Sequence, residues 1–281
     1  MKKRDLAIIA GIYVLAYMVG YLACADIENL YLQFFVFDIV ATVVTFAFSV
    51  LLRNSSVYDA YWSLTPMVMS CWLFAKMGAF GFWQLLFLVM FNFWGLRLTL
   101  NWMSVFTDFS YEDWRYRKYR DETPRLLWPA VNFFGIHLMP TLVVFAGMLP
   151  LFSIAEGHVG PESALGMAIV LLGVALEHAA DRDMHAFLEK TAGDEARPVC
   201  REGLWGRSRH PNYLGEILVW VGVFLAMVVY DFGHWYFCVG AVSIAIMFNI
   251  VSIPLMEKRQ LARRPEYAEY CEETSRLLIR R

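Results

Sequence analysis

The segment formed by residues 204–216 carries the side chains with the clearest chemical potential. It reads Leu-Trp-Gly-Arg-Ser-Arg-His-Pro-Asn-Tyr-Leu-Gly-Glu. Pro211 predicts a helix that continues from Asn212, because proline suits the first turn of a helix. Two arginines and a histidine would then lie just outside the free N–H groups of that helix (Arg207, Arg209 and His210). This spacing is typical both of an anion site for phosphate or carboxylate and of a basic loop held at a membrane surface by its charges.

Two further polar groups lie at or inside apolar runs. Asp59 stands in the sequence Tyr-Asp-Ala-Tyr-Trp, which opens an apolar segment. An acid at the edge of a membrane span is costly, which favours a functional role, and the alternative is a helix N-cap. Arg97 lies inside another apolar run, where it needs a polar partner or must extend its side chain toward the interface.

Polar residues also gather at the ends of three later segments. Residues 111–116 read Tyr-Glu-Asp-Trp-Arg-Tyr and are typical of an interfacial helix with acidic residues at its start. Glu177, Asp181 and His185 share one face of a helix, where they could hold a metal or ribose hydroxyls. Because the closely paired histidines of diiron enzymes are missing, we predict no metal site. Residues 256–270 form a basic tail that could lie on anionic lipid.

These residues must be positioned by a membrane-embedded framework. Hydrophobic residues make up 59% of the 281 residues and charged residues 18%, which predicts a polytopic membrane protein. Eight apolar segments predict an all-α transmembrane bundle, with seven or nine crossings possible because the third segment is short. The segments are 6–25, 34–52, 62–77, 82–106, 127–153, 164–181, 213–230 and 234–256. None of the five cysteines forms a C-x-x-C pair, so we expect neither disulfides nor a zinc site.

The charges predict the orientation of the chain in the membrane. With eight spans, nearly all of the 24 Lys and Arg residues fall in one set of alternating loops. The positive-inside rule then places both termini and the long polar loops in the cytoplasm. We expect one integral membrane domain over residues 1–281, in the inner membrane of a bacterium or the endoplasmic reticulum of a eukaryote. The active site would face the cytoplasm.

The motif Arg-His-Pro-Asn-Tyr followed by Gly-Glu resembles the signature of two groups of integral membrane enzymes. One is the steroid 5-alpha-reductase-like family, including a bacterial branch of unknown function, and the other is the isoprenylcysteine carboxyl methyltransferase family. Trp-Gly-Leu-Arg-Leu around Arg97 and Glu-Asp-Trp-Arg-Tyr at residues 112–116 resemble the reductase-like proteins. The resemblance runs from about Asp59 to the C-terminus.

This resemblance implies an NADPH-dependent reductase of a carbon–carbon double bond in a steroid-like or other lipid. Asp59 would grip the substrate carbonyl, Tyr58 and Tyr61 would be proton donors, and Trp94 stands where the steroid reductases have a catalytic tyrosine. The part of the chain from about residue 95 to 281 would carry the cofactor pocket. Its cofactor-binding residues would be Arg97, Asp113, Arg115, Tyr116, Glu177, Asp181, Arg207, Arg209, His210, Asn212, Tyr213, Glu216, Glu257, Arg259 and Tyr267.

Two other functions are compatible with the same residues. The first is an S-adenosylmethionine-dependent methyltransferase of a membrane lipid or prenyl thioether, and the second is a non-catalytic lipid-binding protein. All three functions involve the bilayer and a hydrophobic substrate or ligand, and none involves nucleic acid. The isolated His137, His158 and His234 are assigned no role.

Overall fold

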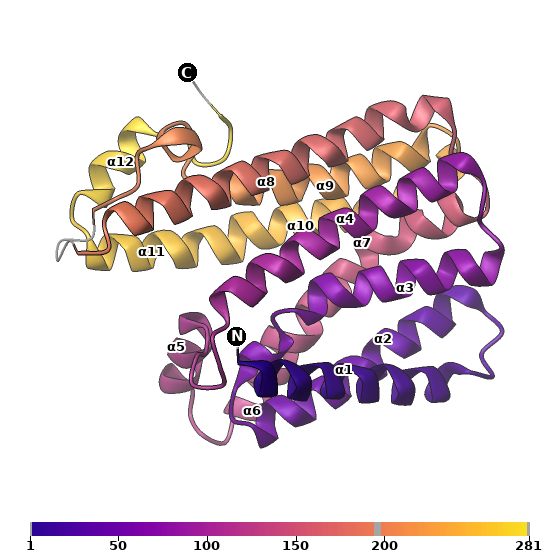
Figure 1. Ribbon diagram of the computed structural model, residues 1–281, viewed down its shortest axis with the longest axis horizontal. Coiled ribbons are helices and arrows are strands. Elements are labelled where there is room, and N and C mark those ends of the chain that lie inside the picture. The colour runs from indigo at the N-terminus through magenta and orange to yellow at the C-terminus, as the bar shows by residue number, and fades with distance from the viewer. Residues whose placement is uncertain (1, 194–197, 280–281) are drawn as a thin grey trace. The chain divides into compact units, whose positions relative to one another are not determined.

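The computed structural model describes residues 2–193 and 198–279, and helices are its regular elements throughout this part of the chain (Figure 1). Seven helical segments there are long and apolar enough to cross a membrane. The predicted all-α transmembrane bundle is therefore confirmed, with a number of spans inside the expected range. The seven segments are Lys3–Cys24, Leu30–Leu51, Phe82–Val105, Trp128–Ala155, Pro161–Lys190, Pro211–Val228 and Phe232–Arg263.

The predicted third span is an apolar helix, α3 (Tyr61–Met77), of 17 residues. At about 1.5 Å per residue it is shorter than the roughly 30 Å of a hydrocarbon core. Its N-cap is Ala60, and no side chain caps it. The alternative that Asp59 is a helix cap is therefore wrong. The orientation of the termini stays a prediction.

The helices group into two compact units, and each is described by itself. The first unit contains the residues up to Phe80 together with Phe91–Met148. The second contains Gly81–Met90 and the residues from Leu149 onward. The prediction of a single domain over residues 1–281 stays a prediction.

The first unit is built on α1 (Lys3–Cys24), α2 (Leu30–Leu51) and α3, with α5 (Trp114–Glu122) outside the apolar segments. Part of α4 (Phe82–Val105), the short α6 (Trp128–Ala130) and the start of α7 (Met139–Ala155) also belong to it. Its core contains the side chains of Ile9, Tyr13, Val57, Tyr61 and Phe106, which come from four different segments. A 3-10 turn, η1 (Ser55–Tyr58), therefore holds its residues inside the unit, with Tyr58 only 1% exposed.

The second unit is built on α8 (Ala164–Lys190), α9 (Pro211–Val228), α10 (Cys238–Met247), α11 (Ile253–Arg263) and α12 (Tyr267–Glu273). In this unit a π-helical turn, Phe248–Ser252, joins α10 to α11. Another π-helical turn, Val131–Leu138, precedes α7 in the first unit. A proline stands two residues after the end of each turn, namely Pro254 and Pro140. Because proline lacks an N–H and its ring crowds the preceding turn, it favours this local widening.

Glycines bring α8 and α9 into backbone contact, and Figure 1 shows the two helices side by side. A Cβ on Gly173 would lie 2.5 Å from the Gly215 carbonyl oxygen, and one on Gly166 would lie 2.7 Å from the Gly222 carbonyl oxygen. Small residues at such positions allow the close packing that drives helix association in membranes. This pair of helices is the rigid support of the candidate site.

Candidate functional site

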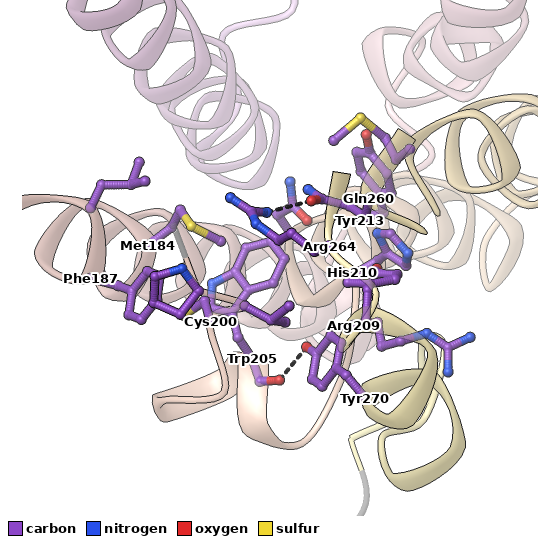
Figure 2. Close-up of a pocket in the computed structure, with 16 residues that line it drawn as sticks. Met184, Phe187, Cys200, Trp205, Arg209, His210, Tyr213, Gln260, Arg264 and Tyr270 are labelled. Atoms are coloured by element: carbon purple, nitrogen blue, oxygen red, sulfur yellow. Dashed lines mark hydrogen bonds between the residues drawn. The ribbon is translucent and has the colours of Figure 1, made fainter. Parts of the chain in front are cut away.

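A cavity of about 210 Å³ lies in the second unit, at the N-terminus of α9. Its walls come from the last turns of α8, the segment 198–213, α11 and α12 (Figure 2). Five of the predicted cofactor-binding residues line it, namely Arg209, His210, Asn212, Tyr213 and Tyr267. The structure therefore gathers the central part of the sequence motif around one cavity.

The start of α9 leaves polar groups without helical partners. Helix α9 begins at Pro211, as predicted, and its N-cap residue His210 provides no side-chain cap. The N–H groups of Asn212 and Tyr213 have no acceptor within the helix, because the first turn of any helix lacks one. The Asn212 Oδ1 atom is buried and has no hydrogen-bond partner among the described residues. Leaving a buried polar atom unsatisfied is costly, so this site favours a ligand that donates a hydrogen bond.

A charged group closes one side of the cavity. Arg209 Nε donates to Glu257 Oε1 at 2.8 Å, and His210 Nε2 lies 3.2 Å from the same oxygen. Burial lowers the pKa of His210, more than the neighbouring carboxylate raises it. His210 is therefore neutral at pH 7, and the charge of the group comes from the Arg209–Glu257 ion pair.

Arg209 also fastens the C-terminal segment to the cavity. Its Nη1 donates to the carbonyl oxygens of Cys271 and Thr274, each at 2.6 Å, and its backbone N–H donates to the Ser275 carbonyl at 2.8 Å. The neighbouring Ser208 hydroxyl donates to the Leu277 carbonyl at 2.8 Å. Arg209 thus holds the C-terminal segment in place and also presents a positive charge at the cavity wall.

Aromatic side chains form much of the remaining wall. The Tyr213 ring lies between the rings of His210 and Phe248, at centroid distances of 5.5 and 4.6 Å. The Tyr270 hydroxyl donates to the Trp205 carbonyl oxygen, as Figure 2 shows. The Trp205 indole donates to the Ala180 carbonyl of α8 at 2.9 Å. These contacts fix the segment before α9 against α8, so the cavity has ordered walls suited to a flat ring.

The other predicted residues of the second unit lie on the same elements. Glu216 is buried one turn into α9 and accepts from the Trp220 indole at 2.8 Å. Glu177 is buried on α8, and its Cγ lies 2.6 Å from the position of a Cβ on Gly215. Asp181 is on α8 and Arg259 on α11. Arg207 lines a different hollow, together with residues of α8.

The first unit holds a buried acid–tyrosine pair. The Tyr61 hydroxyl donates to Asp38 Oδ1 at 2.9 Å and to the Asp38 carbonyl oxygen at 3.0 Å. The Tyr58 ring stacks on the Tyr61 ring at 5.1 Å, and its hydroxyl shares a hydrogen bond of 2.7 Å with Thr141. All four side chains line a cavity of about 10 Å³. A space this small holds about one water, so a larger group enters only if the lining moves.

A second acid–tyrosine pair lies at the polar edge of the same unit. The Tyr116 hydroxyl donates to Asp59 Oδ1 at 2.5 Å. Asp113 is the N-cap of α5 and forms an ion pair with Arg115 at 2.8 Å. These two residues of the Glu-Asp-Trp-Arg-Tyr motif thus have a structural role at the start of α5. Burial, assisted by the charge of Asp113, raises the pKa of Asp59 to about 7. Asp59 is therefore poised to change its protonation near neutral pH.

This raised pKa predicts a pH-dependent stability. Because the pKa of Asp59 is about 7 in the folded state and near 4 in an unfolded chain, folding favours its protonated form. The resulting stabilisation is complete below pH 4 and is lost as the pH rises through 7. We expect Asp59→Asn to remove a fall of several degrees in Tm between pH 5 and pH 8.5, measured on detergent-purified protein.

Asp108→Asn is the matched control for this measurement. A hydrogen bond from Lys2, assisted by hydrogen bonds from Ser110, holds the pKa of Asp108 well below its usual range. Asp108 is therefore ionised in the folded and unfolded states between pH 5 and pH 8.5. Its replacement should leave the change of Tm with pH as it is in the wild type. An equal change of Tm with pH in the wild type and in Asp59→Asn would contradict the prediction.

The remaining predicted residues of the first unit lie on α4. Trp94 is fully buried, and its ring packs against Phe91 at 5.2 Å. Arg97 lies one turn further along and is half-buried. Whether either side chain contributes to chemistry stays a prediction.

Sequence reasoning missed Asp38 and the surroundings of His137. Asp38 is an acid in the middle of an apolar run, and an ionisable residue in that setting is itself a sign of function. His137 is fully buried, its ring lies 4.7 Å from the Tyr58 ring, and its Nε2 has no hydrogen-bond partner in the described part of the chain. No spacing in the sequence pairs it with Tyr58, since the two are 79 positions apart.

The fold and these sites define a polytopic helical membrane protein with buried polar groups and a cavity beside a helix N-terminus. A family model described as "Protein of unknown function (DUF1295)" matches residues 45–274. The chain belongs to this family, which is the steroid 5-alpha-reductase-like family. The predicted family is thus confirmed, while its branch is not tested.

The chain is also similar to "Uncharacterized protein C594.04c" of Schizosaccharomyces pombe (strain 972 / ATCC 24843). The two are 25% identical over 209 residues, which cover 65% of this chain and 60% of that protein. The chain thus spans less than two thirds of that relative's length. No solved structure matches the chain.

Proposed function

We propose that the protein is an NADPH-dependent reductase of a carbon–carbon double bond in a membrane lipid or steroid-like substrate. The observation that carries this proposal is the cavity at the start of α9, where a buried Asn212 Oδ1 needs a donor. Membership of the steroid 5-alpha-reductase-like family supports the reaction type.

The chemistry of the cavity suits part of a dinucleotide. The guanidinium groups of Arg209 and Arg264 line the cavity and could contact a phosphate, and Arg209 is also paired with Glu257. The first N–H groups of α9 add favourable partial charge. Asn212 Oδ1 would accept from a ribose hydroxyl or a carboxamide. At about 210 Å³ the cavity is smaller than the roughly 300–1,000 Å³ of drug-sized ligand sites, so it would hold one portion of NADPH.

Bound NADPH would be the two-electron donor and would supply a hydride for the β-carbon of a polarised alkene, leaving NADP⁺. The chain must then stabilise negative charge on the substrate oxygen and provide a proton for the α-carbon. Of the two acid–tyrosine pairs, we assign this role to Tyr61 and Asp38, because they line a cavity in an apolar setting. Tyr58, stacked on Tyr61, completes the polar lining, and Asp59 is the rival acid. Met69 and Met148 also line this cavity, and such flexible side chains can yield to a substrate.

Cofactor binding by the detergent-purified protein tests the proposal. We expect saturable thermal stabilisation by NADPH and none by S-adenosylmethionine. Stabilisation by S-adenosylmethionine alone would support the methyltransferase alternative. No stabilisation by either would support a non-catalytic lipid-binding protein.

Replacing Asn212 by alanine is expected to weaken NADPH binding about 2- to 10-fold, because one buried hydrogen bond is worth about 0.5–1.5 kcal/mol. Asn249→Ala is the matched control. This substitution removes the same kind of side-chain amide from the same unit. The Asn249 amide donates to the Ala245 carbonyl at 2.9 Å and does not line the cavity. Calorimetric titration would compare the two. Equal affinities would show that the start of α9 is not the cofactor site.

A further inference from the structure

A second hollow, of about 390 Å³, lies between α8 and the segment before α9 in the second unit. Its apolar wall is formed by Leu172, Ala175, Leu176 and Ala179, and its charged end by Arg182, Asp183 and Arg207. We call this hollow the α8 groove. It is separate from the cavity at the start of α9, because the two have no lining residue in common.

The apolar wall follows the axis of a membrane-spanning helix. Its four residues stand at positions i, i+3, i+4 and i+7, so they lie on one face of α8. Leu172 is 52% exposed, and the two alanines leave a depression beside the leucines. From Leu172 to Arg182 the helix rises about 15 Å, at about 1.5 Å per residue. The groove is therefore long, narrow and apolar along most of its length.

The charged end is held in place by the segment before α9. Asp183 Oδ2 accepts from the Leu204 N–H at 3.1 Å, and its Oδ1 lies 3.3 Å from Arg182 Nη2. Gly203 has a φ of +57°, and a Cβ there would lie 2.1 Å from Asp183 Oδ2. This close approach presses the segment onto α8 and brings Arg207 to the same end of the groove as Arg182.

The charges at this end are not balanced within the described residues. Two arginines face one carboxylate, which leaves a net charge of +1. Both arginines are exposed, and the Arg207 guanidinium has no acceptor among the residues that the structure describes. An arginine next to apolar surface at a membrane boundary attracts anionic lipid.

We propose that the α8 groove binds an anionic phospholipid, with its phosphate at Arg182 and Arg207 and an acyl chain along the apolar wall. A soluble phosphate would pair with the arginines but would leave the apolar wall of the groove uncovered. A zwitterionic lipid carries its own cation beside the phosphate, which opposes the net positive charge of the site. This inference does not depend on the proposed reductase function.

Native mass spectrometry of protein delipidated in neutral detergent tests the proposal, with phosphatidylglycerol and phosphatidylcholine as probes. We expect one tightly retained phosphatidylglycerol and at least 10-fold weaker retention of phosphatidylcholine. Arg182→Gln/Arg207→Gln should weaken phosphatidylglycerol retention about 10-fold or more, since each basic residue contributes separately to anionic-lipid binding. Lys3→Gln/Arg4→Gln removes the same charge from the exposed start of α1 and should have no effect.

A groove-filling variant tests the apolar wall with the charges intact. Ala179→Phe should weaken phosphatidylglycerol retention about 10-fold, and inorganic phosphate should not compete. Equal retention of both lipids, competition by inorganic phosphate, or unchanged binding in the arginine variants would overturn the proposal.

NADPH affinity is measured on the same proteins. If Arg207→Gln weakened NADPH binding and left lipid retention unchanged, Arg207 would belong to the cofactor site and the lipid proposal would fail.

Discussion

Replacing Tyr61 with phenylalanine is expected to lower the rate of substrate reduction by about 100-fold or more while NADPH affinity stays within twofold. General acid catalysis by a positioned side chain contributes about 10²–10⁴-fold. The Tyr61 hydroxyl is held by Asp38 at 2.9 Å inside the first unit. Phenylalanine keeps the ring and its packing against Tyr58 and removes only the hydroxyl.

The rate would be followed as NADPH consumption with a panel of enone steroids and unsaturated lipids. Tyr13→Phe is the matched control, because Tyr13 is also buried in this unit and donates to the Val57 carbonyl at 2.5 Å. It does not line the small cavity and should retain turnover. A Tyr61→Phe enzyme with wild-type turnover would remove Tyr61 from the mechanism. If Asp59→Asn abolished turnover instead, the Asp59–Tyr116 pair would take the role.

Gly173→Leu is expected to lower Tm by about 5–10 °C. A Cβ at this position would lie 2.5 Å from the Gly215 carbonyl oxygen and 2.9 Å from the Val219 nitrogen. Both neighbours are backbone atoms, so the helices must separate to admit a side chain. Overpacking costs about 1–3 kcal/mol, and for a protein of this size each kcal/mol lowers Tm by about 2–4 °C.

Thermal unfolding in detergent would measure this effect, together with recovery of the monodisperse protein after mild heating. Gly11→Leu is the control, since a Cβ on Gly11 of α1 meets nothing within 4 Å. Because membrane helices insert before they pack, the Gly173 variant should still reach the membrane. A Tm equal to that of the control would mean that α8 and α9 do not need their close contact.

Much of the fold could be predicted from hydropathy and from proline. Apolar runs of about 20 residues specify spanning helices almost by themselves, and Pro211 marked the first residue of α9. Hydropathy could not predict where α8 ends. The helix continues to Lys190, nine residues beyond the predicted segment, because a helix leaving the apolar layer becomes amphipathic and remains helical.

The candidate sites were less predictable because their members meet through tertiary packing. The motif at 207–216 led to the cavity, but it could not show that Arg207 points to another hollow or that Arg209 is bound by the carbonyls of residues 271 and 274. The sequence predicts a functional role for Asp59 because an acid at the edge of an apolar segment is costly. Its partner is nevertheless Tyr116, and Tyr61 instead pairs with Asp38, 23 positions earlier.

The bonds from Ser208 and Arg209 to the backbone of residues 271–277 have a consequence for biosynthesis. Membrane helices enter the bilayer in order as the chain is made. The segment before α9 is synthesised well before the carbonyls of Thr274, Ser275 and Leu277 that hold it. The α8–α9 pair can therefore assemble during translation, whereas the cavity at its end acquires its final wall only after residue 277 has left the ribosome.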